Sequence, residues 1–366
     1  MIRAILLAPF VVLALLAGIY LLTPQVDLGL PPPQDRFLDI RADFTCIGSG
    51  GSGCYVPQEL LDSYKFGFYL RAFDVSRQEL RDYGDELVAR RMNASIARSR
   101  YVRAAVISAR DGVVRDGRID RSQTRMYVPD AFVAQMARKY PHLEYGASIH
   151  PDRADWHERL AQAKRDGAVL VSWLPAAMHI DPSDLHYVQY YRALADLGLP
   201  LLVRIGGDDA FGHANDAFGD PRKLALPLRE GVTVIATHIS ATAEYDGQSG
   251  YKLLLAMLKK NPRLYMDISG LTRINNVGYL TDALAFPGAR DRMLYGSDWP
   301  LQFFPLVSPF YQWPDVDLPH AKTIQNIGNE WDRDVALKMA LGVPGPVFRR
   351  SVKLLASRPT PAPRLY

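Results

Sequence analysis

The chain has 366 residues, of which 48% are hydrophobic and 22% charged, and its formal net charge is +4 at pH 7. It is long enough to bury a large core in one large domain or two small ones. A nucleic-acid-binding surface needs clustered basic residues, whereas Lys and Arg are spread along this whole chain, so we expect no nucleic-acid partner. The nearest basic cluster falls on a predicted helix and strand start and is typical of a solvated face: Arg90, Arg91, Arg98, Arg100 and Arg103.

The N-terminal segment contains a run of 19 uncharged, mostly aliphatic residues at positions 4–22. About 20 such residues are needed to cross a bilayer, so the run predicts a membrane anchor within residues 1–23. Arg3 precedes the run and Asp27 and Asp35 follow it, which places the rest of the chain on the extracytoplasmic side. The alternative is a cleaved signal peptide, although the run lacks a clear small-x-small site before Thr23.

A regular alternation of strands and helices follows a proline-rich spacer at residues 24–35 and extends over residues 36–356, before a tail at 357–366. Strands are predicted at 37–40, 102–108, 143–149, 169–174, 200–205, 232–238, 264–268 and 293–295. Helices are predicted within 57–100 and at 129–140, 154–166, 184–197, 221–230, 250–260 and 277–286, with two or three closing helices in 319–356. Strict alternation predicts a parallel sheet, and eight repeats over about 250 residues predict a closed (β/α)8 TIM barrel.

The first predicted strand leads into a glycine-rich loop, and residues 37–54 read FLDIRADFTCIGSGGSGC. Because side chains alternate along a strand, Arg41 and Asp43 are expected to point to the same side, at the mouth of the barrel. Cys46 and Cys54 could form a disulfide in an oxidising compartment, and two free thiols are an equal alternative. The glycine loop could bind a phosphate through backbone N–H groups, but no Lys follows it, which favours a tight turn.

The carboxyl ends of the strands carry the chemistry in this fold. Ionisable and polar residues occupy these positions: Arg41, Asp43, His150, Ser172, Arg204, His238, Asp267 and Asp298. Their convergence on one mouth indicates a functional site. Aromatic residues follow the last strand and are expected to form a lid over the mouth, to touch the membrane, or only to pack: Phe303, Phe304, Phe310, Tyr311 and Trp313.

With these strand ends in place, residues 36–356 resemble the amidohydrolase superfamily, in its amidohydrolase-related branch of single-metal hydrolases and decarboxylases. The motifs that carry the resemblance are, in barrel order, the first strand with its GSGC loop, SIHPDRAD, VSWLPAAMHIDP, GLPLLVRIGG, ATHIS, LYGSDWP and DRDVALKMALGVP. The resemblance implies a divalent metal, often zinc, held by a His-x-His pair on strand one, a His on strand five and an Asp on strand eight. A His on strand six would assist proton transfer, and the metal would activate a water molecule.

This chain departs from the implied ligand pattern. The His-x-His pair falls on Arg41 and Asp43 and the strand-five His on Arg204, whereas Asp298 and His238 are kept. An Arg side chain has no lone pair to offer a metal, so we predict no metal and no other cofactor. The two guanidinium groups would supply the positive charge instead, with Arg41–Asp298 or Arg204–Asp43 as the expected pairing across the mouth.

The predicted function is metal-independent hydrolysis of a small carboxylated lactone, ester or amide, with Asp298 as the base and His238 assisting. The resembled superfamily includes lactone hydrolases that work without a metal through an Asp at this position. The expected substrate-binding residues are Arg41, Arg204, Asp43, Ser172, which stands where relatives often have a lysine, and His150. The alternative is a retired enzyme whose charges only pair with one another and whose barrel binds a ligand or partner at the membrane. The sequence leaves a homo-oligomer open.

Overall fold

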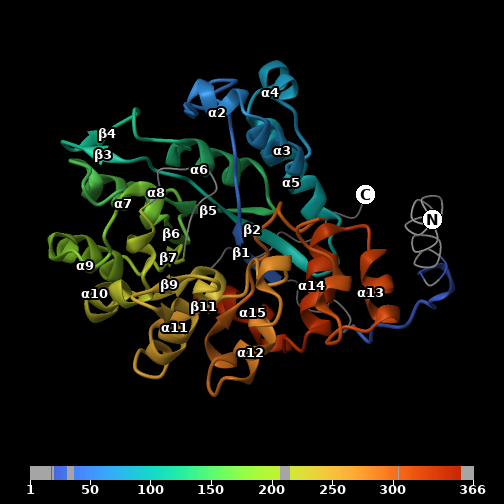
Figure 1. The fold of residues 1–366 in the computed structure, drawn as a ribbon. Coiled ribbons are helices and arrows are strands. Elements are labelled where there is room, and N and C mark those ends of the chain that lie inside the picture. The colour runs from blue at the N-terminus through green and yellow to red at the C-terminus, as the bar shows by residue number, and fades with distance from the viewer. Residues whose placement is uncertain (1–17, 19, 31–36, 207–214, 304, 356–366) are drawn as a thin grey trace, which may run out of the picture.

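Eight parallel strands form the centre of the computed structural model, which describes residues 18, 20–30, 37–206, 215–303 and 305–355. Their order is β1-β2-β5-β6-β7-β8-β11-β12, and helices surround them (Figure 1). Backbone hydrogen bonds from Ile40 N to Tyr295 O (3.1 Å) and from Asp43 N to Trp299 O (2.8 Å) join the last strand region to β1. The predicted TIM barrel is confirmed.

The barrel strands lie within the predicted ranges, except that the first extends two residues further. They are β1 (Phe37–Ala42), β2 (Val102–Ser108), β5 (Leu143–Ala147), β6 (Leu170–Trp173), β7 (Leu201–Val203), β8 (Val234–Ala236), β11 (Leu264–Asp267) and β12 (Met293–Leu294). Two small antiparallel hairpins in loops were not predicted, because two-residue strands show no period: β3 (Val114–Arg115) with β4 (Arg118–Ile119), and β9 (Glu244–Tyr245) with β10 (Gln248–Ser249).

The helices follow the predicted alternation. The helical region predicted at residues 57–100 consists of four helices, because Ser63 and Ser76 cap new helices by accepting N–H bonds and Gly84 has a φ of 78°. These helices are α2 (Gln58–Asp62), α3 (Tyr64–Ala72), α4 (Arg77–Tyr83) and α5 (Glu86–Ala97). The others are α6 (Asp130–Lys139), α7 (Trp156–Arg165), α8 (Pro175–Met178), α9 (Val188–Asp196), α10 (Ala225–Arg229), α11 (Gly250–Leu258), α12 (Tyr279–Ala285), α13 (Leu318–Gln325), α14 (Glu330–Ala340) and α15 (Gly345–Leu354).

Two apolar layers stabilise the barrel. Alternate strand residues form an inner cluster that fills the barrel: Leu38, Ile40, Ala104, Val106, Leu170, Leu202, Ile235 and Leu294. The intervening residues of the same strands pack outward against the helices in a larger cluster. The inner side chains are buried, so the barrel is a packed core whose chemistry is left to the strand ends.

A β-bulge in β1 decides where Arg41 points. Asp39 pairs with Ala105 and Ala42 with Ile107, so β1 uses three steps where β2 uses two. The extra residue breaks the alternation, because Asp39 bonds Trp331 of α14 outside the barrel while Arg41 reaches Asp298 at the mouth. Bulges often re-aim side chains beside active sites, and this one aims Arg41 and Asp43 to the same side, as predicted.

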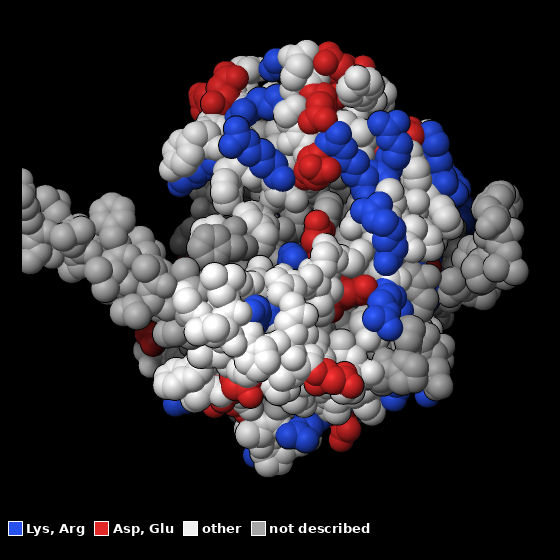
Figure 2. Space-filling model, turned by 90° about the vertical axis from the view of Figure 1, so that its right-hand side faces the viewer, with Lys and Arg blue, Asp and Glu red and all other residues white. Residues whose placement is uncertain are grey.

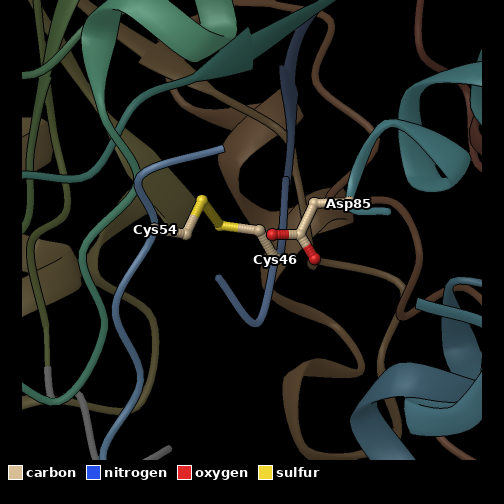
Figure 3. A group of neighbouring side chains, drawn as sticks. All are labelled: Cys46, Cys54 and Asp85. Atoms are coloured by element: carbon tan, nitrogen blue, oxygen red, sulfur yellow. A yellow bond between two sulfur atoms is a disulfide. The ribbon is translucent and has the colours of Figure 1, made fainter. Parts of the chain in front are cut away.

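The glycine loop after β1 is closed by the disulfide Cys46–Cys54 and is wrapped around the buried carboxylate of Asp85 (Figure 3). Asp85 accepts hydrogen bonds from the backbone N–H groups of residues 47, 48 and 49, each at 2.9 Å, and from Ser52 Oγ at 2.6 Å. Of the two alternatives for the cysteines, the structure has the disulfide. The backbone donors that could have bound a phosphate bind an internal carboxylate instead.

Asp39 is a fully buried carboxyl that accepts hydrogen bonds from Arg41 N (3.0 Å), Ser297 N (2.9 Å) and Trp331 Nε1 (3.0 Å). Burial raises the pKa of Asp39 to about 6, so the folded chain holds a proton there that the unfolded chain loses near pH 4. This contribution to stability is complete below about pH 4 and is lost as the pH rises to about 6.

We therefore expect the free energy of unfolding of the wild type, relative to Asp39→Asn, to fall between about pH 4 and pH 6. The slope should reach at most about 1.4 kcal/mol per pH unit. Urea unfolding at several pH values measures it, with the exposed Asp196→Asn as the matched control. A difference that stays constant or rises across this range would contradict the assignment.

The predicted anchor at residues 4–22 lies outside the described residues, apart from Gly18 and residues 20–22. Within the part of the chain that the structure describes, no helix has the length and apolar character needed to span a bilayer. Residues 31–35 of the predicted spacer and the tail at 357–366 also fall outside the described ranges.

The charged surface agrees with the sequence pattern. Figure 2 shows basic side chains lying among acidic ones, with several basic side chains in a row along one edge of this face. The arginine cluster found in the sequence is not one patch, because Arg103 is buried 3.8 Å from Glu144 and Arg91 pairs with Glu79 at 2.6 Å.

Candidate functional site

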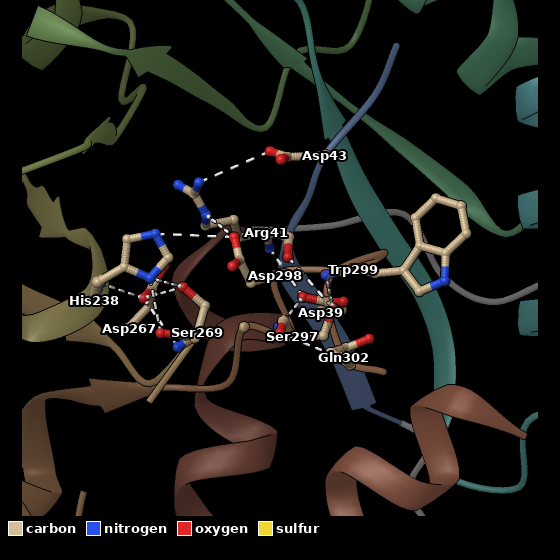
Figure 4. A network of polar contacts seen from close by, with 12 residues as sticks. Asp39, Arg41, Asp43, His238, Asp267, Ser269, Ser297, Asp298, Trp299 and Gln302 are labelled. Carbon is tan, nitrogen blue, oxygen red and sulfur yellow. Dashed lines mark hydrogen bonds and ion pairs between the residues drawn. The ribbon is translucent and has the colours of Figure 1, made fainter. Parts of the chain in front are cut away.

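Asp298 lies at the centre of a network of charged side chains at the carboxyl ends of the strands (Figure 4). It follows β12, adopts a left-handed backbone conformation with a φ of 65°, and donates its N–H to Arg41 O at 3.0 Å. Its side chain is 2% exposed. A buried carboxylate requires compensating donors, and its two oxygens have different partners.

Arg41 pairs with one of these two oxygens of Asp298. Its Nε donates to Asp298 Oδ1 at 3.2 Å, which confirms the predicted Arg41–Asp298 pair, and its guanidinium lies 3.8 Å from Asp43. Arg41 therefore bridges two carboxylates, one just beyond the end of its own strand and one from the opposite side of the β1–β12 seam. The expected pair of Arg204 with Asp43 stays a prediction.

The other oxygen, Asp298 Oδ2, forms an ion pair with Arg273. Arg273 was not identified as a site residue from the sequence. It lies in the loop after β11, where Ile274 N bonds Leu306 O at 3.0 Å and Asn276 Nδ2 bonds Gly270 O at 2.9 Å. Arg273 lies six positions beyond the end of β11, so counting residues at strand ends could not find it. No local pattern in the sequence marks it as a site residue.

His238 faces the same carboxylate with one ring nitrogen. Its Nδ1 lies 2.8 Å from Ser269 O, which can only accept, so Nδ1 carries the proton and Nε2 is a lone-pair acceptor. Nε2 is buried without a hydrogen-bond partner among the described residues and lies 3.9 Å from Asp298 Oδ1. Gly270 makes this approach possible, because a Cβ there would come within 2.9 Å of His238 Nδ1.

Asp267 holds the backbone of His238 in place through a hydrogen bond. Its Oδ1 accepts from His238 N (3.0 Å), Ser269 N (3.1 Å) and Ser269 Oγ (2.6 Å). Burial raises the pKa of Asp267, and Arg41 acts against this shift. Asp267 therefore positions His238 and Ser269.

The charges of the network follow from burial and from the guanidinium groups. Burial opposes ionisation of Asp298, but Arg273 and Arg41 outweigh it and hold the pKa of Asp298 well below its ordinary value. Burial, reinforced by Arg41 and Arg204, holds the pKa of His238 well below its ordinary value. At neutral pH the network thus contains an ionised Asp298 beside a neutral His238.

Tyr69 of α3 lies near enough to this network to feel its charges. Burial raises its pKa above the ordinary value, and the nearby carboxylates of Asp43 and Asp298 act in the same direction. Its neighbour Phe73 packs edge-on against Trp299, with ring centroids 5.1 Å apart. α3 therefore covers one side of the mouth, which the sequence pattern did not indicate.

The remaining predicted site residues are placed differently. Arg204 follows β7, is partly exposed, and contributes positive charge at both Asp298 and His238. Ser172 is a buried residue of β6. His150 is buried and both of its ring nitrogens serve the fold: Nε2 lies 3.0 Å from Met178 O, and Nδ1 accepts from Asp152 N at 3.1 Å. The network therefore contains Arg41, Asp43, Arg204, His238 and Asp298. His150 is not part of it, because its ring stabilises a loop through hydrogen bonds.

The residues at the implied ligand positions do not fit a divalent metal. Arg41 and Arg204 have no lone pair, and both oxygens of Asp298 are already paired with guanidinium groups. Among the described residues, one group of three possible ligand side chains lies within 4.8 Å, namely Cys46, Cys54 and Asp85, and none of the three stands at an implied ligand position. Its two sulfurs form the disulfide, so it offers no thiolate.

Comparisons with known proteins agree with this fold. The amidohydrolase family model matches residues 82–320, and no curated protein matches the sequence. An uncharacterised TIM-barrel protein from Bordetella bronchiseptica is 16% identical with a TM-score of 0.51, over 83% of this chain and 100% of that one. A Pseudomonas putida protein assigned as a 2-pyrone-4,6-dicarboxylic acid hydrolase is 14% identical with a TM-score of 0.50, over 88% and 97%.

Proposed function

Since the chain belongs to the amidohydrolase family, we propose that it hydrolyses a small carboxylated lactone, ester or amide without a metal ion, with Asp298 as the base. The observation that carries the proposal is the ionised Asp298 beside the unpartnered Nε2 of a neutral His238, 3.9 Å away. One water molecule can bridge two acceptors at this separation by donating one hydrogen to each. A water molecule held in this way would be an oriented nucleophile.

The proposed reaction balances without any further reactant. Asp298 accepts one proton from the water while the hydroxide adds to the carbonyl carbon of the substrate. A guanidinium group faces the oxyanion that forms, which lowers the barrier because the charge is already in place. The bond between the carbonyl carbon and the leaving atom then breaks, and the leaving atom takes the proton from Asp298. His238 orients the water through Nε2 and does not change its protonation state.

The arginines define the substrate class. The network holds three guanidinium groups, those of Arg41, Arg204 and Arg273. Its carboxylates are those of Asp43 and Asp298, and the carboxyl group of Asp267 lies deeper. A substrate carboxylate bound by the partly exposed Arg273 would draw that guanidinium away from Asp298 Oδ2. Losing one positive neighbour raises the basicity of Asp298 when substrate is present. The lactone dicarboxylate named for the Pseudomonas neighbour belongs to this substrate class.

A retired enzyme is the second candidate, because one observation favours it. Both oxygens of Asp298 are paired with arginines, as expected of charges that only neutralise each other. Against this, His238, Asp43, Arg204 and Arg273 are partly exposed rather than closed over. A screen of carboxylated lactones and esters separates the two, since a retired barrel would bind such compounds and leave them intact.

Metal independence gives a direct prediction. Because Arg41 and Arg204 replace the nitrogen ligands, dialysis of the purified protein against a chelator should leave its hydrolytic rate and Tm unchanged. Elemental analysis should find well under one equivalent of zinc, manganese or iron per chain. About one equivalent, or a rate that falls on chelation and returns with added metal, would contradict this proposal.

We also propose that the barrel works outside the cytoplasm. The disulfide Cys46–Cys54 closes the loop that follows Asp43, and disulfides persist mainly in oxidising compartments. The uncharged run at residues 4–22 and the charges that flank it favour the same location. Thiol labelling of the intact cell extract before and after reduction would test it, since two free thiols in the untreated protein would argue for a reducing compartment.

A further inference from the structure

The end of the uncharged run and the residue that follows it are fixed to α13. Lys322 Nζ donates to the carbonyl oxygens of Tyr20 (2.7 Å), Leu21 (3.2 Å) and Thr23 (2.7 Å), where a helical turn ends. A lysine in this position satisfies the last carbonyls of a helix and complements the negative end of its dipole. The end of the run therefore has a defined place on the barrel.

Further contacts continue this attachment along α13. Val26 N donates to Thr323 Oγ1 at 3.0 Å, and the ring of Tyr20 lies 6.0 Å from that of Phe310. Leu28 packs against the main apolar core. Figure 1 shows this N-terminal segment, drawn in blue, running alongside α13. Residues 20–28 therefore form a strap along α13 that is held at several points.

Large apolar side chains are exposed around this strap. Leu21 is 75% exposed, Leu22 86% and Trp313 68%. Trp313 lies three positions beyond Phe310, which contacts Tyr20. Leu318 is also exposed and lies one turn before Lys322 on the same face of α13. We call Leu21, Leu22, Trp313 and Leu318 the interfacial surface.

We propose that the interfacial surface lies against a lipid bilayer and that Lys322 holds the barrel in one orientation on it. The uncharged run of 19 residues, nearly long enough to cross a bilayer, ends on this surface at Leu22. Trp is favoured at the level of the lipid headgroups, and the exposed Trp313 follows Phe310, whose ring contacts Tyr20 near that end. The proposal concerns how the barrel is presented and does not rest on the proposed hydrolysis.

The charges near the surface identify the kind of lipid contact. Asp315 and Asp317 are exposed between Trp313 and Leu318, so this surface is not basic. Attraction to anionic lipids therefore contributes little, and the contact depends on apolar burial. Zwitterionic phosphatidylcholine vesicles are accordingly the suitable probe.

Tryptophan fluorescence tests the contact directly. The chain has five Trp residues, and Trp313 is the exposed one, since Trp173, Trp299 and Trp331 are buried and Trp156 is partly buried. The full chain is reconstituted into phosphatidylcholine vesicles with or without brominated acyl chains, which quench indole emission on contact. We expect brominated lipid to quench the wild type and Trp313→Phe to lose most of that quenching.

Two lysine variants test the orientation. Lys322→Met should lower the quenching by at least about twofold while the protein still floats with the vesicles, because the uncharged run still inserts. Lys252→Met, which removes the same charge from an exposed site on α11, should change nothing.

Three results would overturn the proposal. They are wild-type protein that does not float with vesicles, emission that brominated lipid does not quench through Trp313, and quenching that Lys322→Met leaves intact. A lipid-independent dimer that shields Trp313 from acrylamide would assign the surface to a second copy of the chain instead.

Discussion

Asp298→Asn is expected to lower the rate of lactone or ester hydrolysis by about 10³-fold, the usual contribution of a positioned general base. The variant keeps the size of the side chain but cannot accept a proton from water. It also removes the carboxylate that Arg41 and Arg273 share, so that Arg41 keeps only its ion pair with Asp43. Both guanidinium groups are then available to a carboxylate ligand, so the affinity for the hydrolysis product should increase.

The opposite signs of these two effects make the experiment decisive. Steady-state kinetics measure the loss of rate, and calorimetric titration with the product measures the gain in affinity. Asp196→Asn, which changes an exposed carboxylate, is the matched control and should alter neither. A variant that keeps its rate would show that Asp298 is not the base, whereas tighter binding with no activity in the wild type would favour a retired enzyme.

The free energy of unfolding should also fall in this variant, by about 3 kcal/mol, because Arg41 would remain charged and buried. Circular dichroism and the product titration together confirm that the folded state persists. Loss of both rate and binding would indicate a collapsed site and would leave the base assignment unsupported.

Lys338→Met is expected to destabilise the fold by about 3–5 kcal/mol, the usual cost of removing one partner from a buried ion pair. Lys338 is fully buried and its Nζ donates to Asp334 Oδ2 and to Gly296 O, both at 2.8 Å. Asp334 Oδ2 also accepts from Tyr295 Oη at 2.9 Å. The variant would leave an uncompensated carboxylate between α14 and the end of β12.

A double variant separates this charge effect from packing. Asp334→Asn combined with Lys338→Met removes both charges and should recover much of the stability, as expected for coupled partners. Lys353→Met on α15 is exposed and should stay within about 0.5 kcal/mol of the wild type. Urea unfolding measures all four proteins; a cost below about 1 kcal/mol for Lys338→Met would refute the importance of the buried pair.

The pairing of Asp298 illustrates why the site was only partly predictable. Arg41 was found because it ends β1, and counting strand ends works wherever chain position and spatial position coincide. Arg273 joins the same network from the loop after β11, and Tyr69 of α3 lies near it. Their positions depend on how a loop and a helix pack, which carries no periodic signal.

His150 shows the reverse case. It ends a strand and has an ionisable ring, so its sequence position resembles that of His238. The fold uses both of its nitrogens, through Met178 O and Asp152 N, whereas His238 Nε2 has no partner among the described residues. Which nitrogen stays available depends on neighbours that come from other parts of the chain.

By itself, the sequence determined the barrel, because hydrophobic periods and regular loop spacing are local properties that a parallel sheet must satisfy. It also determined that Arg41 and Arg204 stand where nitrogen ligands are implied, because chemical identity does not depend on the fold. Only the tertiary structure decided the bulge that aims Arg41 at Asp298, the disulfide, and the carboxylate that fills the glycine loop. These depend on distances between residues far apart in the chain, and such distances are set by packing of the whole molecule.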